Sequence, residues 1–280
     1  MAWTLTDDVG SYLATVDELL RSDPVRNTVL LTVLASLSRR GPMAFGEARP
    51  VLGWWSPDGV PRAAVLQTPP RPLLTTALPG DSAQQLAREL ADHGVRLSAV
   101  NGREADATAL AAAWRVVSGI DGRTRQRQRL YQLGALVQPD PPPDGAARIA
   151  TPADAPVIGP WLAAFSAEIG EPEAAGALVS DRLDRGQLLL WELRGEPVSL
   201  AGHTDVIAGV ARVGPVYTPP DLRGRGYAGG VTAAVSELAI SRGAKSVILF
   251  TDLANPTSNS LYRRLGYEPV EDRVVLIFGQ

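Results

Sequence analysis

Residues 213–230 read Val213-Gly214-Pro215-Val216-Tyr217-Thr218-Pro219-Pro220-Asp221-Leu222-Arg223-Gly224-Arg225-Gly226-Tyr227-Ala228-Gly229-Gly230. They predict a strand, a glycine-rich turn and the start of a helix, whose apolar residues then recur at helical spacing as Val231, Ala234, Val235, Leu238 and Ala239. Glycines let backbone N–H groups converge, and a helix N-terminus adds unpaired donors and partial positive charge. Arg223 and Arg225 add full charges on side chains that suit phosphate. The turn is therefore predicted to bind a diphosphate.

Other nucleotide-binding loops share this physics but fail on detail. No Lys-Ser or Lys-Thr follows the glycines, as a Walker-type loop requires. The spacing Gly-x-Gly-x-x-Gly of dinucleotide loops does occur at Gly224, Gly226 and Gly229, but the acidic ribose partner that such loops need about 20 residues on is absent, because residues 242–251 contain no Asp or Glu.

A second segment reads Phe250-Thr251-Asp252-Leu253-Ala254-Asn255-Pro256-Thr257-Ser258-Asn259-Ser260-Leu261-Tyr262-Arg263-Arg264-Leu265-Gly266-Tyr267. It predicts a strand followed by a helix that Asn255 and Pro256 begin. Helical spacing places Asn255, Asn259 and Tyr262 on one face, leaving Leu261 and Leu265 to pack on the sheet.

Together the two segments resemble the GNAT acetyltransferases. The first is similar to the GNAT signature Arg/Gln-x-x-Gly-x-Gly/Ala at Arg223, Gly226 and Ala228, and the second is similar to the Asn-x-x-(Ser/Ala)-x-x-(Leu/Phe)-Tyr-x-(Arg/Lys)-x-Gly-(Phe/Tyr) element of that family. The resemblance covers residues 148–280. It implies acetyl-CoA as cosubstrate, with the pyrophosphate held by Arg223, Gly224, Arg225, Gly226, Tyr227, Ala228 and Gly229.

The resemblance also implies further roles around the thioester. Val216, Tyr217 and Thr218 are expected beside the acetyl carbonyl and pantetheine arm, and Asn255 and Asn259 beside the pantetheine or phosphate region. Tyr262 is expected to donate a proton to the leaving thiolate. Its phenol has a suitable basicity for that step.

Acetyl transfer also needs a donor at the carbonyl oxygen and a route for the ammonium proton. Gly214-Pro215 suggests a bulge that would free the N–H of Val216 or Tyr217. The general base is left open among Glu168, Glu192, His203 and Asp205, and many sites of this kind need none. A strand histidine such as His203 also fits a purely structural role.

The proline-rich stretch at 137–147 predicts a linker between residues 1–136 and 148–280. After it, the sequence predicts a capping box at Thr151 to Asp154 that opens a helix to Ile169. A second helix over Ala174–Leu183 follows, and then strands over Gln187–Leu193, Val198–Asp205, Val210–Tyr217, Ser246–Thr251 and Arg273–Phe278.

The N-terminal half shows the same order of elements without the motifs. Its equivalent turn, Leu78 to Ala83, has one glycine and an acid that would repel phosphate. The predicted fold is therefore α/β (α+β), with tandem GNAT-like domains that each hold a mixed, mostly antiparallel sheet flanked by helices, the first domain being degenerate.

Composition narrows the function further. The 280 residues are 45% hydrophobic and 20% charged, with a formal net charge of −3, which predicts no nucleic-acid partner. The alternating tract Arg123 to Arg129 reads as a solvated edge strand or a domain-contact strand. Zero cysteines and two histidines argue against a covalent cysteine intermediate, and no metal site is expected.

The expected reaction is direct transfer from acetyl-CoA to a small-molecule or peptide amine, and the alternative is an acyl-CoA sensor without turnover. The N-terminus is acidic and the run Thr28 to Leu37 is short, so we expect no membrane segment and a cytoplasmic monomer or homodimer.

Overall fold

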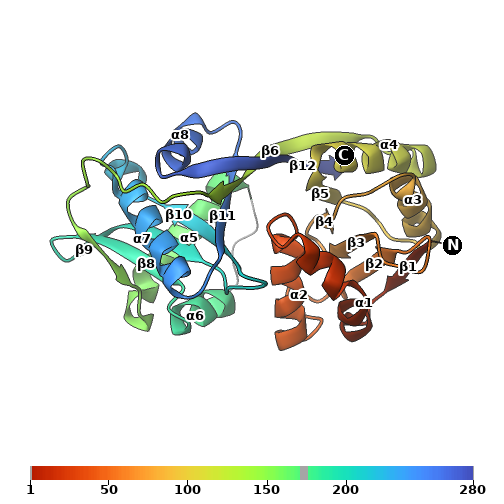
Figure 1. The fold of residues 1–280 in the computed structure, drawn as a ribbon, viewed down its shortest axis with the longest axis horizontal. Helices are drawn as coiled ribbons and strands as arrows, with labels where there is room; N and C mark the ends of the chain where they lie inside the picture. Colours follow the sequence, from red (N-terminus) through yellow and green to blue (C-terminus); the bar gives the residue numbers. More distant parts are fainter. Residues whose placement is uncertain (1, 171–175, 280) are drawn as a thin grey trace. The chain divides into compact units, whose positions relative to one another are not determined.

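The computed structural model describes residues 2–170 and 176–279 and divides into two compact units (Figure 1). Unit 1 comprises Met1–Leu130, Thr251–Ala254 and Val270–Gln280. Unit 2 comprises Tyr131–Phe250 and Asn255–Pro269. Each unit has its own hydrophobic core.

Unit 1 follows the order strand, two helices, three strands, helix, strand, helix, strand. The elements are β1 Trp3–Thr6, α1 Val9–Ser22, α2 Thr28–Arg40, β2 Val51–Trp55, β3 Ala63–Gln67, β4 Leu73–Thr75, α3 Ser82–Asp92, β5 Ala99–Arg103, α4 Glu104–Ser118 and β6 Gly122–Leu133. Strands β1 to β4 pair antiparallel in sequence order, and β4 pairs parallel with β5 across α3. Strand β1 had no predicted counterpart, because four residues at a chain end carry too little pattern.

The core of unit 1 lies on both faces of this sheet because its strands alternate. Trp55 packs with residues of α3 and α4, whereas the ring of its neighbour Trp54 lies 6.4 Å from that of Tyr12 in α1. The same core cluster includes Val274, Leu276 and Phe278 from the end of the chain. These come from β12, Tyr267–Phe278, which pairs antiparallel with β5.

The end of the chain therefore completes unit 1, where the sequence placed it in the second domain. The predicted boundaries of 1–136 and 148–280 differ from the compact units for this reason. Strand pairing over such a separation leaves no local signal, since only the continuous apolar run of the final strand, residues 274–278, is visible in the sequence.

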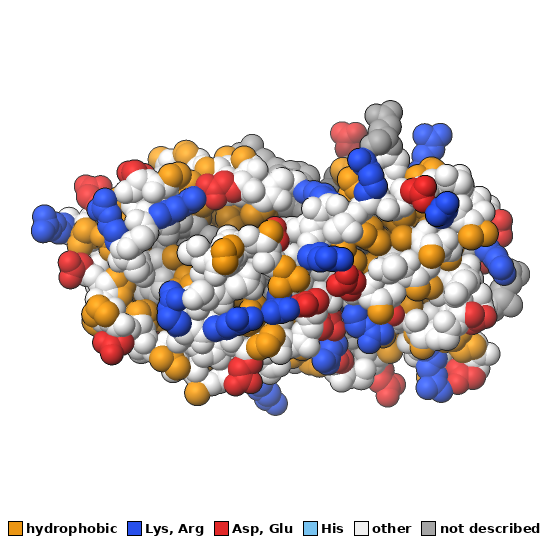
Figure 2. Space-filling view, turned by 90° about the horizontal axis from the view of Figure 1, so that it is seen from above, with side chains coloured by type: hydrophobic (Ala, Val, Ile, Leu, Met, Phe, Trp, Pro, Cys, Tyr) orange, Lys and Arg blue, Asp and Glu red, His pale blue; other side chains and the backbone are white. Residues whose placement is uncertain are grey.

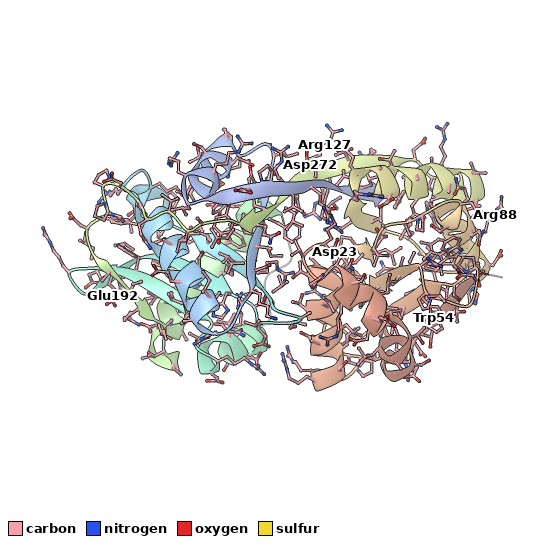
Figure 3. The ribbon with its side chains drawn as sticks, viewed as in Figure 1. Asp23, Trp54, Arg88, Arg127, Glu192 and Asp272 are labelled. Carbon is pink, nitrogen blue, oxygen red and sulfur yellow. The ribbon has the colours of Figure 1, made fainter. Side chains whose placement is uncertain are left out.

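The basic tract lies in β6, which has β12 as a neighbour in the strand order and so is not the edge strand that one prediction described. Within unit 1, Arg127 pairs with Glu104 at 2.9 Å and Arg129 with Asp272 at 2.6 Å (Figure 3). The face shown in Figure 2 likewise has acidic and basic side chains interspersed.

Unit 2 repeats the order of unit 1. Its elements are β7 Ala146–Ile149, η1 Pro152–Asp154, α5 Ala155–Ile169, α6 Gly176–Asp184, β8 Leu188–Leu193, β9 Glu196–His203, β10 Val210–Tyr217, η2 Pro220–Leu222, α7 Tyr227–Ser241, β11 Ser246–Asp252 and α8 Pro256–Arg264. The capping box of Thr151 and Asp154 is present, and the Asn255 side chain accepts from the N–H of Ser258 at the start of α8. The predicted start of α6 at Ala174 lies outside the described residues.

The strand order of unit 2 is β11-β10-β9-β8-β7, with a parallel pair only between β10 and β11, which α7 connects. Leu189 and Ala201 belong to the cluster under α7, whereas Leu188, Leu190 and Leu200 join Ile158 and Leu162 of α5. Helices therefore cover both faces of the sheet. Both units combine antiparallel strands with one parallel pair, which confirms the predicted fold class.

A bulge interrupts β10 in unit 2. Its register with β9 shifts between Val213, opposite His203, and Val216, opposite Ala201. Pairing with β11 runs from Val210 to Val213, so the strand beyond the bulge leaves β11. A bulge at Gly214-Pro215 was predicted from the sequence. Because one extra residue reverses the alternation of faces, Val216 faces the α7 cluster and Tyr217 faces α5.

The proline-rich stretch that the sequence predicts as a linker packs onto unit 2. Its ends are tied down: the N–H of Val137 donates to the carbonyl of Leu265, and the indole of Trp191 donates to that of Asp144 at 2.9 Å. The side chain of Gln138 also donates to Glu237 of α7 at 2.6 Å. We call residues 137–145 the strap. Prolines keep this segment out of helices and inner strands but do not prevent it from packing. Composition alone could not show that it packs against unit 2.

Candidate active site

The glycine-rich turn opens α7 as predicted. Gly224 and Gly226 both have left-handed backbones, with φ of 77° and 83°, and Gly226 is the N-cap of the helix. The N–H of Gly230 donates to the carbonyl of Gly226 at 3.1 Å. The preceding N–H groups, of Tyr227, Ala228 and Gly229, belong to the first turn, where a helix supplies no acceptor. The turn can therefore present convergent donors to an anion.

The strap borders this turn. A Cβ at Gly226 would lie 3.3 Å from Cβ of Pro143, and one at Gly230 would lie 2.9 Å from the rings of Pro143 and Trp191. Two demands thus explain the glycines. Gly224 and Gly226 meet the backbone's need for positive φ, and Gly230 meets the need for space beneath the strap.

The two arginines of the turn contact protein acceptors. Arg223 donates from Nε to the carbonyl of Thr218 at 2.9 Å and from Nη2 to Glu168 at 2.6 Å, and its guanidinium lies 5.8 Å from the ring centroid of Tyr217. Arg225 donates to the carbonyl of Asp221 at 3.2 Å. Both charges stay next to the turn, but the convergent groups are its backbone amides.

The sequence left open whether the bulge in β10 frees the N–H of Val216 or that of Tyr217, and the backbone beyond the bulge distinguishes the two. The Ser199 hydroxyl, on β9, donates to the carbonyl of Tyr217 at 3.0 Å and also bonds to the Thr218 hydroxyl at 2.8 Å. N–H and C=O of a strand residue point to the same side, and neighbouring residues alternate. The N–H of Tyr217 therefore points toward β9, and that of Val216 points the opposite way, where pairing with β11 has ended.

Helix α8 places Tyr262 and Asn259 inward. Tyr262 is 8% exposed and packs edge-on against Tyr267, with ring centroids 6.0 Å apart. Burial raises the pKa of Tyr262 to about 12. Asn259 accepts from the Tyr131 hydroxyl at 3.0 Å and donates to the carbonyl of Asn255 at 2.7 Å. These bonds brace the start of α8, so the two asparagines have structural work in addition to the cofactor contacts expected of them.

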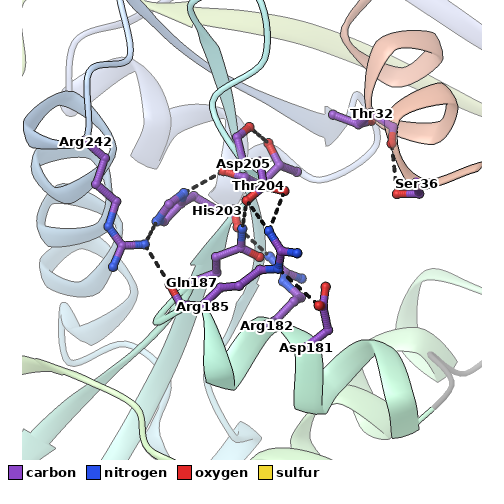
Figure 4. Close-up of polar contacts among 10 residues, drawn as sticks. All are labelled: Thr32, Ser36, Asp181, Arg182, Arg185, Gln187, His203, Thr204, Asp205 and Arg242. Atoms are coloured by element: carbon purple, nitrogen blue, oxygen red, sulfur yellow. Dashed lines mark hydrogen bonds and ion pairs between the residues drawn. The ribbon is translucent and has the colours of Figure 1, made fainter. Parts of the chain in front are cut away.

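The polar surroundings of two base candidates do not favour them. His203 is 1% exposed, with Nδ1 2.7 Å from the carbonyl of Thr204 and Nε2 3.1 Å from Nη1 of Arg242 (Figure 4). Nδ1 therefore carries the hydrogen and Nε2 accepts one. Burial, with the nearby Arg242 and Arg182, lowers the pKa of His203. Glu192, labelled in Figure 3, accepts from Arg148 at 2.6 Å.

The other two candidates are also engaged. Glu168 bonds to Arg223, and Asp205 accepts from Gln187 at 2.6 Å (Figure 4). Each of the four candidates therefore already holds at least one hydrogen-bond partner.

Two side chains that the sequence did not single out lie at the bulge. Trp161 of α5 has its ring centroid 6.2 Å from that of Tyr217. Arg182 of α6 donates to the carbonyl of Gly214 at 2.6 Å. No motif marks Arg182, since its acceptors are backbone carbonyls of residues 21 and 32 positions along the chain.

Within residues 2–170 and 176–279 there is no group of three or more histidines and carboxylates able to hold a metal. No helix in the same described part of the chain is long and apolar enough to cross a bilayer.

Comparisons with known proteins bear on the fold. Residues 194–276 match the family model described as FR47-like protein. A GCN5-related N-acetyltransferase from Sphaerobacter thermophilus is similar over 98% of this chain and 94% of its own, with a TM-score of 0.61 and 18% identity. A GNAT-family acetyltransferase from Colwellia psychrerythraea is similar over 100% of both chains, with a TM-score of 0.59 and 14% identity.

A GCN5-related N-acetyltransferase from Kribbella flavida is similar over 78% of this chain and 87% of that protein's chain, with a TM-score of 0.56 and 20% identity. No curated protein matches by sequence. At these sequence identities, of 14–20%, the structural similarity shows the fold alone. The chain therefore has the fold of these acetyltransferases, and the family match covers the part of it that holds the turn before α7.

Proposed function

We propose that this protein is an N-acetyltransferase that moves an acetyl group from acetyl-CoA directly to an amine. One observation carries the proposal. The first turn of α7 presents unpaired amides beside the end of β10, where the N–H of Val216 points into the space left by β11. An anion site and a free strand amide at adjacent ends of one strand-helix unit suit a pyrophosphate linked to a thioester.

The residues present fit coenzyme A. The amides of residues 224–229 would hold the pyrophosphate, and the positive φ of Gly224 and Gly226 keeps that backbone approachable. Val216, Tyr217 and Thr218 would line the pantetheine arm. Asn255 and Asn259 lie at the start of α8, and their cofactor contacts belong to the proposal. Acetyl-CoA supplies the activated acetyl group, and no metal is required.

Val216 and Tyr262 would carry the chemical roles. The amine attacks the thioester carbonyl, an N–C bond forms, and the N–H of Val216 stabilises the charge that develops on the oxygen. The C–S bond then breaks and Tyr262 gives its proton to the sulfur. Because burial raises the pKa of Tyr262 to about 12, its phenol stays protonated at neutral pH and can act as that acid.

The amine proton has no assigned base in this proposal. His203 is neutral and has both ring nitrogens engaged, and Glu192 is paired with Arg148. We therefore assign the proton to water. The acceptor is a small molecule or peptide amine, approaching on the α5 face beside Trp161 and Tyr217.

The test is turnover with acetyl-CoA and a broad panel of amines, followed by release of free thiol. Thiol produced in excess of enzyme, together with an acetylated amine identified by mass spectrometry, supports the proposal. Tight coenzyme A binding with no thiol release across the panel would instead identify a sensor. No binding of coenzyme A at all would overturn the assignment of the turn.

A further inference from the structure

We propose that Arg182 is a positioning residue that holds the β10 bulge and thereby aims the N–H of Val216 at the reacting carbonyl. The inference rests on the proposed function and extends it to a residue outside every sequence motif of the site.

The contacts of Arg182 place it at the bulge itself. Its Nη2 donates to the carbonyl of Gly214 at 2.6 Å. The same nitrogen donates to the carbonyl of His203 at 3.2 Å (Figure 4). Gly214 lies between Val213 and Val216, where the register with β9 shifts. A carbonyl in such an interruption lacks its regular ladder partner, and an unpaired carbonyl in the interior is costly. One nitrogen of Arg182 thus supplies the donor for β10 and also holds the neighbouring strand β9.

The surroundings of Arg182 are built for this contact. A Cβ at Gly202 would lie 2.8 Å from Nη2 of Arg182, so the glycine leaves room for the guanidinium. Burial lowers the pKa of Arg182 to about 10, with Arg212 also lowering it and Asp205 raising it. The side chain therefore stays charged at neutral pH despite burial, and its bond to Gly214 is a charge-assisted one.

The consequence for chemistry follows from the chain path. Only Pro215 separates Gly214 from Val216, so a shift of the Gly214 carbonyl turns the next peptide planes with it. Misplacing a catalytic group by about 1 Å can cost about a hundredfold in rate. The proposed pyrophosphate amides lie further along the chain, at the start of α7 beyond Thr218 and η2, so we expect their positions to change little in Arg182 variants.

The experiment compares Arg182→Met and Arg182→Lys with Arg185→Met as a matched control. Arg185 lies just beyond α6 and pairs with Asp181 and Asp205, away from the bulge. We expect Arg182→Met to lower kcat by between about tenfold and a hundredfold, with the coenzyme A dissociation constant within about twofold of wild type. Lysine has one nitrogen with three donors, so Arg182→Lys should recover part of kcat. Arg185→Met should keep kcat within about twofold.

A second readout does not need turnover. The carbonyl stretch of bound ¹³C-labelled acetyl-CoA should fall below its solution frequency in wild type and return toward it in Arg182→Met. Urea melts establish which variants are folded, and if Arg182→Met does not fold, Arg182→Lys carries the comparison. A folded Arg182 variant with unchanged kcat and unchanged carbonyl frequency would overturn the positioning role. Failure of the wild type itself to bind acetyl-CoA would instead overturn the proposed function.

Discussion

The two ends of helix α7 allow a controlled test of the pyrophosphate site. Gly226 precedes the helix and Gly243 follows it, and both have left-handed backbones, with φ of 83° and 90°. Any L-residue at either position carries a comparable strain of about 1 kcal/mol. Aspartate at each position adds the same charge and a similar backbone strain, and a Cβ at Gly226 also contacts Pro143 at 3.3 Å, whereas one at Gly243 has no neighbour within 4 Å. Only Gly226 lies at the proposed site.

The expected effect of Gly226→Asp comes from simple electrostatics. At about 6 Å and an effective dielectric of about 40, each phosphate charge repels the new carboxylate by about 1.4 kcal/mol. The two charges of a pyrophosphate together weaken binding by about 3 kcal/mol, or about a hundredfold. Gly243→Asp lies at the far end of a 15-residue helix, about 22 Å away, so its affinity should stay within about twofold.

Isothermal titration with coenzyme A measures both variants, and urea melts check that each unfolds cooperatively. Raising the salt to about 1 M shortens the screening length to about 3 Å, so the deficit of Gly226→Asp should shrink. Equal affinities for Gly226→Asp and Gly243→Asp would refute the assignment of the anion site to the first turn of α7.

Four further predictions concern Tyr262, His203 and Phe278. Tyr262→Phe should lower kcat by about 10²–10⁴-fold with unchanged coenzyme A affinity, and an unaltered rate would remove its role as acid. Because burial raises the folded pKa of Tyr262 to about 12, its contribution to stability is complete below pH 10 and lost as pH rises toward 12, which urea melts of wild type against Tyr262→Phe would show. Burial lowers the pKa of His203, so its contribution is present above about pH 6.5 and lost on acidification; His203→Gln should flatten the fall of unfolding free energy between pH 7 and pH 5, and an equally steep fall would contradict this. Phe278, 7% exposed and 6.4 Å from the ring of Trp114, should cost about 3–5 kcal/mol of unfolding free energy when changed to alanine, whereas Val116→Ala, at an 85% exposed position, should cost less than about 0.5 kcal/mol; similar losses would argue against β12 completing unit 1.

Local chemistry made much of the fold predictable. The capping box at Thr151, the cap at Asn255 and the glycines around α7 all lie where their side chains or backbones are needed, within a few residues of their partners. The bulge at Gly214-Pro215 was predicted for the same reason, because proline cannot donate to a ladder. The strap was predicted only as a linker, since composition reports which backbone angles a segment can adopt and not what it packs against.

In the candidate site, too, local features could be predicted from the sequence and contacts between distant segments could not. Motif residues such as Gly226, Asn259 and Tyr262 could be located from spacing, although their roles in binding and catalysis stay predictions. Spacing could not show that Asn259 accepts a hydrogen bond from Tyr131, or that Nε2 of His203 accepts one from Arg242. Those partners come from distant segments.

The glycine-rich turn and helix α8, with Asn259 and Tyr262, could be predicted from the sequence because each depends on residues within one or two helical turns of it. Three features depend on the folded chain: the return of Val274, Leu276 and Phe278 to unit 1, the outward N–H of Val216, and the contact of Arg182 with Gly214. Each joins residues that are remote in sequence through strand pairing or a single hydrogen bond. Such contacts are selected by burial and by the need to satisfy every backbone carbonyl, and neither demand leaves a local pattern.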